Sequence, residues 1–153
     1  MPAESSPLKL TILESIKTAM RAKEKDRLAT LRQISASLKQ FEVDNRQDLD
    51  DDGVITILTK MCKQRRDSIS QFEAAGRDDL STIEIAELAI IEEFMPTPLT
   101  ADEIASEIAA TIAELGATGP KEMGNVIKAL RPKFQGRADM GSVSGLVKAA
   151  LTA

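Results

Sequence analysis

The sequence predicts an all-α protein, and three of its features lead to this expectation. Apolar residues recur three and four positions apart over most of the 153 residues, which is the spacing of one helix face. Ala, Leu, Ile and Met supply most of the apolar mass and aromatic residues only 3%, a composition that favours helices. No stretch alternates between apolar and polar residues over the length of a strand. We therefore expect helices joined by short turns.

Residues 1–95 are expected to form an N-terminal four-helix domain. Ser6 and Pro7 suit the cap and the first residue of a helix that runs to about residue 22. The same apolar spacing continues in a second helix to about Val43 and, after a polar loop, in a third helix over about 54–75. Gly76 suits a left-handed helix end, and a fourth helix follows from about residue 80.

Two prolines mark the boundary that we expect between two domains. Pro96 and Pro98 each remove a backbone donor and restrict the residue before them, so they end the fourth helix and stiffen the chain. Residues 96–100 are therefore predicted to be a proline linker.

Residues 101–153 are expected to form a small C-terminal three-helix domain. Thr100 and Glu103 fit a capping box that opens a fifth helix, and Gly116 suits its end. A sixth helix should start near residue 120, and Asp139 can cap a seventh.

Composition argues against independent catalysis. The chain has no His, which removes the usual general base and zinc ligand and excludes Ser-His and Cys-His nucleophiles. The one cysteine, Cys62, falls on an apolar helical stripe, where a buried structural thiol is the expected role. We expect no catalytic residue, no metal and no cofactor. A free cysteine suits a reducing compartment and no long apolar run begins the chain, so we expect a cytoplasmic protein without membrane contact.

An acidic loop before the third helix has an alternative reading as a calcium site. Residues 48–53 match the first half of a calcium-binding loop, but Thr59 stands where the closing bidentate Glu is needed. We expect instead that the acids stabilise the positive end of the third helix.

The charge is unevenly distributed. Residues 81–119 carry eight acids and no basic residue, whereas residues 120–153 carry six basic residues and two acids. Such a basic tail suits phosphate contacts, and the scarcity of aromatic residues favours folded RNA over stacked single strands. The alternative is a solvated basic face. The predicted RNA-binding residues are Lys121, Lys128, Arg131, Lys133 and Arg137, and Lys60, Lys63 and Arg66 form a candidate secondary basic surface.

One arginine interrupts the apolar stripe of the third helix. If the third and fourth helices form a hairpin, Arg65 lies near Glu87, which interrupts the apolar face of the fourth helix. We expect a structural ion pair that fixes the register of the hairpin. The alternative is an arginine that binds a ligand phosphate or acidic group in a groove.

Six segments carry a recognisable pattern: residues 63–68 and 71–80, together with 23–25, 28–32, 87–88 and 94–96. In these segments the chain resembles the YqeY (GatB/YqeY-domain) family. Residues 119–151 are similar to the tail domain of the B subunit of the tRNA-dependent Asp/Glu amidotransferase. This resemblance implies a tRNA-linked helical module, because the amidotransferase chemistry lies in other domains and another subunit.

The sequence therefore predicts a non-catalytic helical module that binds tRNA or another structured RNA. One alternative is an accessory to, or weak carrier of, a glutamine-dependent amidotransferase (carbon–nitrogen ligase) activity, with an amidotransferase or another protein as partner. A second alternative is a protein-interaction module that binds no RNA.

Overall fold

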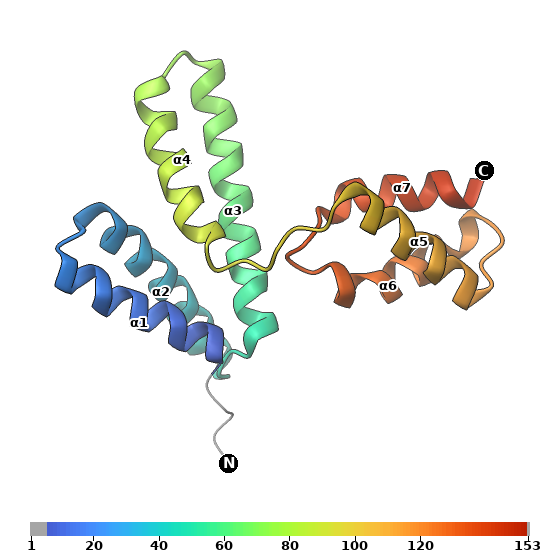
Figure 1. Cartoon of the computed structure of the whole chain (residues 1–153), viewed down its shortest axis with the longest axis horizontal. Coiled ribbons are helices and arrows are strands. Elements are labelled where there is room, and N and C mark those ends of the chain that lie inside the picture. Colours follow the sequence, from blue (N-terminus) through green and yellow to red (C-terminus); the bar gives the residue numbers. More distant parts are fainter. Residues whose placement is uncertain (1–5, 153) are drawn as a thin grey trace. The chain divides into compact units, whose positions relative to one another are not determined.

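The computed structural model describes residues 6–152, and within this range the chain contains seven α-helices, one short 3-10 helix and no strand (Figure 1). The all-α class predicted from the sequence is confirmed. The chain divides into two compact units, of which the first ends at Met95 and the second begins at Pro96. Each unit has its own hydrophobic core.

The first unit begins with a hairpin of two helices. Helix α1 spans Pro7–Ala22, and its N-cap Ser6 accepts a hydrogen bond from the Lys9 N–H. Helix α2 spans Lys25–Asn45 and packs against α1. The short turn between them requires one residue in the left-handed conformation, and Lys23 adopts this conformation with φ of 58°. The first helix thus has the bounds that its cap and proline predicted.

A second hairpin completes the first unit (Figure 1). Helix α3 spans Asp51–Ala74 and helix α4 spans Asp78–Glu92. Gly76, with φ of 70°, lies in the turn between them. Asp50 caps α3 by accepting the Gly53 N–H at 2.8 Å, so the acidic loop provides the helix cap.

The core of the first unit is aliphatic. Its fully buried side chains come from all four helices, which explains why the apolar spacing recurs in each of them. The largest are Ile12, Leu31, Ile34, Leu38, Val54, Leu58 and Ile91.

The second unit contains helices α5, α6 and α7, which span Ala101–Leu115, Met123–Phe134 and Met140–Thr152. Thr100 and Glu103 form the expected capping box at the start of α5. The sixth helix starts later than expected, because Pro120–Glu122 form a 3-10 turn, η1, before α6 begins. Phe134 is fully buried at the centre of this unit, among side chains of α5, α6 and α7.

The proline-containing segment is bound to the second unit. The Leu99 N–H donates to the Arg137 carbonyl at 2.8 Å, and Arg137 Nε donates to the Thr97 carbonyl at 2.9 Å. Residues 97–99 therefore pack on the turn between α6 and α7. No helix in residues 6–152 is long and apolar enough to cross a membrane.

Candidate nucleic-acid interface

The five predicted RNA-binding residues fall into two groups. Lys121 lies in η1, and Lys128 and Arg131 lie one turn apart on α6. All three are exposed, and none forms a side-chain hydrogen bond or ion pair with another residue that the structure describes. Their charges are therefore available to a ligand.

The other two cations make contacts inside the second unit. Lys133 Nζ lies 3.3 Å from Glu107 Oε2 on α5, with both side chains about half exposed. Arg137 is half-buried and binds the Thr97 carbonyl. Lys133 thus has a carboxylate partner, and Arg137 holds the proline segment.

Helix α6 separates its buried and charged faces. Val126, Leu130 and Phe134 are fully buried, which fixes the rotation of the helix about its axis. Lys128 and Arg131 consequently lie on the solvent side, and Lys121 precedes Lys128 by two helical turns. The three free cations form what we call the tail surface: Lys121, Lys128 and Arg131.

A hollow of about 450 Å³ lies beside Lys128. Its lining joins an apolar part with one ammonium, one amide and one carboxylate. The Glu122 carboxylate accepts the Thr118 N–H at 2.7 Å, so it is committed to the loop before α6. The hollow is lined by Leu115, Ala117, Glu122, Asn125, Lys128 and Ala129.

Arg65 lies in a cluster of acids on the α3–α4 hairpin. Its Nε is 2.8 Å from Glu87 Oε2 and 3.4 Å from Glu84 Oε2, and its Nη2 donates to the Gln33 side chain. The Nε–H is not aligned for a hydrogen bond, so the contact with the carboxylates is ionic. All three charged side chains are less than one quarter exposed. Two carboxylates offset this guanidinium, which leaves no free cation for a ligand phosphate.

The candidate secondary basic surface on α3 is small. Lys60 and Lys63 are exposed and lack a partner among the described residues. Arg66 Nη2 lies 3.1 Å from Glu92 Oε1, with both side chains about half exposed. Two free lysines remain there.

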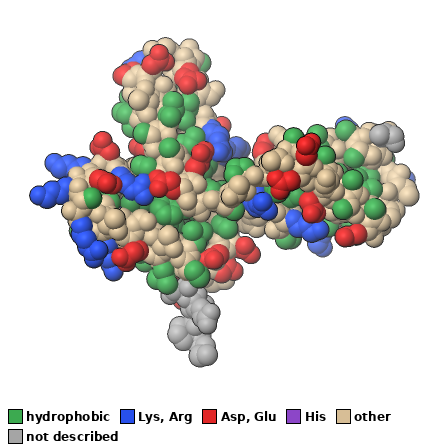
Figure 2. All heavy atoms as spheres, in the orientation of Figure 1, with side chains coloured by type: hydrophobic (Ala, Val, Ile, Leu, Met, Phe, Trp, Pro, Cys, Tyr) green, Lys and Arg blue, Asp and Glu red, His purple; other side chains and the backbone are tan. Residues whose placement is uncertain are grey.

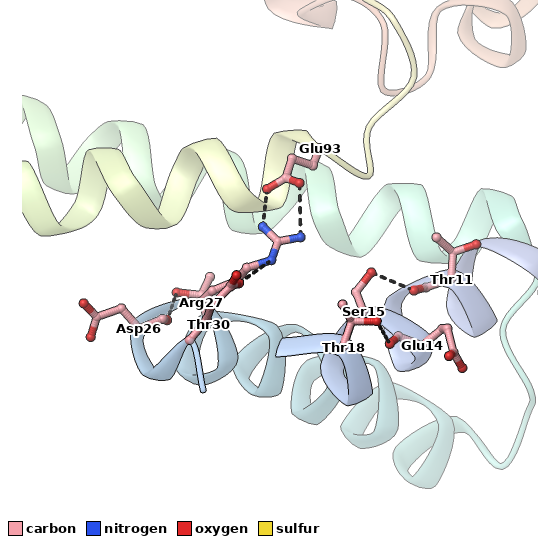
Figure 3. Close-up of polar contacts among 9 residues, drawn as sticks. Thr11, Glu14, Ser15, Thr18, Asp26, Arg27, Thr30 and Glu93 are labelled. Carbon is pink, nitrogen blue, oxygen red and sulfur yellow. Dashed lines mark hydrogen bonds and ion pairs between the residues drawn. The ribbon is translucent and has the colours of Figure 1, made fainter. Parts of the chain in front are cut away.

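A second pocket, of about 270 Å³, lies along α1 in the first unit. Its lining includes three hydroxyl side chains of α1 and Arg27 of α2. Figure 3 shows the Arg27 guanidinium hydrogen-bonded to the Glu93 carboxylate. The Arg27 Nη1 and Nη2 atoms donate to Glu93 at 2.6 and 3.1 Å. This bidentate hydrogen bond raises the pKa of Arg27 and uses the Nη1 and Nη2 donors of its guanidinium. The hydroxyls of Thr11, Ser15 and Thr18 each donate to a carbonyl four residues earlier. Arg27 is the one cation among the lining residues, and because Glu93 binds it, the pocket offers no free cation.

Cys62 is buried in the first unit, and burial raises the pKa of its thiol. A raised pKa lowers the thiolate fraction, which is the opposite of what a nucleophile requires. Among the described residues, no group of three or more His, Cys, Asp or Glu side chains is placed to hold a metal ion.

Comparison with known proteins relates nearly the whole chain to one family. The family model described as "Yqey-like protein" matches residues 9–151. Three relatives share the name "Altered inheritance of mitochondria protein 41, mitochondrial". That of Eremothecium gossypii is 36% identical over 69% of this chain, that of Kluyveromyces lactis 32% over 89%, and that of Meyerozyma guilliermondii 35% over 56%. The aligned region spans 59%, 71% and 44% of the lengths of these relatives, respectively.

The relatives contradict the cytoplasmic location expected from the sequence, because all three are named mitochondrial. The expectation was wrong for a physical reason. A free cysteine reports the redox state of a compartment and does not identify the compartment.

The fold is helical throughout its described part, and the family model covers all seven helices almost from end to end. The chain belongs to the YqeY family.

Proposed function

We propose that this chain is a non-catalytic helical module that binds structured RNA, with tRNA as the first candidate, through the tail surface. The observation that carries the proposal is that three cations of the second unit are exposed and unpaired. Phosphate oxygens are the ligands that such cations prefer, and contacts of this kind recognise shape more than sequence. The similarity of residues 119–151 to the amidotransferase B-subunit tail points to tRNA among structured RNAs.

In this proposal the two units have different roles. The three helices after the proline segment supply the phosphate contacts. The four helices before it form a rigid platform, held by Arg65, Glu84 and Glu87 within one hairpin and by Arg27 and Glu93 between α2 and the end of α4.

The second candidate is a helper of a glutamine-dependent amidotransferase, favoured by the same tail similarity. Independent amide transfer needs an activated nucleophile, whereas the chain has no His and its one thiol is buried. A glutaminase assay on the purified chain tests for catalysis by the chain itself, because release of ammonia from glutamine would favour a weak amidotransferase over the binding module.

The experiment that tests RNA binding titrates fluorescently labelled tRNA with the full chain and its variants at about 50 mM salt. We expect the triple variant Lys121→Gln, Lys128→Gln, Arg131→Gln to bind at least tenfold more weakly than wild type. In a matched pair of single variants, Lys128→Gln should weaken binding more than Lys133→Gln, since both remove the same charge from α6 but Lys133 already has a carboxylate partner. Unchanged affinity in the triple variant rejects the tail surface as the site.

A further inference from the structure

Helix α2 carries a row of cations that the proposed function does not use. Lys25, Arg32 and Lys39 are seven residues apart, so they lie on one face of the helix, about 10 Å from one to the next. All three are exposed, and none has a side-chain partner in the described part of the chain. We call this row the α2 stripe.

One acid, Asp26 in the first turn of α2, lies within the span of the α2 stripe. From Arg27 to Phe41 the helix contains no Asp or Glu. Glu42 follows, but it is mostly buried, and Lys9 and the Leu49 N–H bind its two carboxylate oxygens. Residues 1–95 carry 14 basic residues and 18 acids, and 15 of these acids lie outside α2.

The hairpin turn extends the positive surface. Arg21 at the end of α1 and Lys23 in the turn are also exposed and unpaired within the described residues. Figure 2 shows Lys and Arg side chains gathered over this end of the α1–α2 hairpin. Two further unpaired cations therefore lie at the turn, next to the Lys25 end of the α2 stripe.

The residues between the cations decide which polyanion fits. Ala29 and Ala36 are exposed and lie on the same side of α2, so a ligand backbone can approach the helix closely. A membrane-binding face would carry large apolar side chains between its cations, and here it carries alanines. The stripe is about 21 Å long, a length over which one nucleic-acid strand places about six phosphates.

We propose that the α2 stripe is a second phosphate-binding surface, which docks a double-helical segment of RNA by its backbone. This surface lies in the first unit and is separate from the tail surface. The choice of RNA among polyanions rests on the proposed function, whereas the positive surface itself does not.

The test compares two variants of the full chain that lose the same charge. One is Lys25→Gln, Arg32→Gln, Lys39→Gln, and the control is Lys17→Gln, Arg77→Gln, Lys148→Gln, which removes exposed cations from α1, the α3–α4 turn and α7. Gln is a good helix former, so both variants should keep the helical content of wild type by circular dichroism. The probe is a 20-base-pair RNA hairpin, titrated from 50 to 200 mM salt.

We expect the stripe variant to bind the hairpin at least tenfold more weakly at 50 mM salt and to flatten the slope of log K against log salt by about 2, while the control changes affinity less than twofold. Equal losses in the two variants would overturn the proposal, because they would show a general charge effect. The proposal would also be overturned if the stripe variant bound RNA as wild type does but had lost binding to polyglutamate or to anionic vesicles. The ligand of the α2 stripe would then be an acidic peptide or a membrane.

The tail-surface variant, titrated with the same hairpin, distinguishes this proposal from the proposed function. Loss of binding in the stripe variant alone supports the α2 stripe and rejects the tail surface. Loss of binding in the tail-surface variant alone supports the tail surface and rejects the α2 stripe.

Discussion

Arg65 Nε on α3 lies 2.8 Å from Glu87 Oε2 on α4, across the hairpin that ends the first unit. The sequence pointed to this pair because each residue interrupts an apolar face. Glu84, one helical turn earlier on α4, is a second carboxylate at 3.4 Å. The guanidinium thus joins two successive turns of α4 to α3, and we expect it to fix the register of the two helices.

We expect Arg65→Met to destabilise the first unit by about 1–3 kcal/mol, because it leaves Glu84 and Glu87 close together without a counter-charge. This destabilisation is smaller than that expected for a fully buried ion pair, since these side chains are partly exposed. Hydrogen exchange of α3 and α4 amides measures the change. Adding Glu84→Gln and Glu87→Gln should restore most of the protection, and Arg66→Met, which breaks a half-exposed pair, should cost less than about 0.5 kcal/mol.

Two glycines of the second unit should respond to alanine in opposite directions. Gly145 lies within α7 with no atom close to an added Cβ, so Gly145→Ala should stabilise the unit by about 0.5–1 kcal/mol. Gly116 ends α5 with φ of 63°, so Gly116→Ala should destabilise it by about 1 kcal/mol. Urea unfolding of each variant gives the sign, and two shifts in the same direction contradict the account.

The Glu42 carboxylate should contribute stability only above mildly acidic pH. The hydrogen bond from Lys9 Nζ, followed by that from the Leu49 N–H, holds the pKa of this carboxyl below its ordinary value of 4.5. A lowered folded-state pKa stabilises the fold above the unfolded pKa, and this stability is lost as pH falls through the folded pKa. The difference in unfolding free energy between wild type and Glu42→Gln should therefore be largest near pH 7 and shrink below about pH 4.5. A difference that stays constant down to pH 3 would show that the charge is not involved.

The Cys62 thiol should be inert in the native protein. It is buried, and burial raises its pKa, so alkylation by iodoacetamide at pH 7.5 should be slow until denaturant is added. Labelling at the rate of a free thiol without denaturant would contradict the structure around α3.

The sequence predicted helices well where apolar spacing and caps agree. Ser6 and Pro7 fix the start of α1, and Thr100 with Glu103 fixes that of α5. Helix α3 begins at Asp51, before the expected residue 54, because its first turn is acidic and has no apolar residue to reveal it. The 3-10 turn before α6 could not be predicted for a different reason, since Pro120 suits the first turn of either kind of helix.

Long-range polar contacts could not be predicted from spacing. Arg27 meets Glu93, and Lys9 meets Glu42, across turns whose geometry no periodicity specifies. For the same reason Lys133 and Arg137 were grouped with the free cations, although Glu107 and Thr97 engage them. The α2 stripe is hidden in the net charge, because residues 1–53 contain nine basic residues and ten acids and only the helix brings three of the cations onto one face.

The salt dependence of tRNA binding tests the central claim most directly, because counterion release counts the phosphates that cations contact. The measurement compares wild type with the Lys121→Gln, Lys128→Gln, Arg131→Gln variant between 50 and 200 mM salt. If the tail surface binds RNA, the slope of log K against log salt should be shallower in the variant by about 2. Parallel lines for the two proteins would contradict the claim.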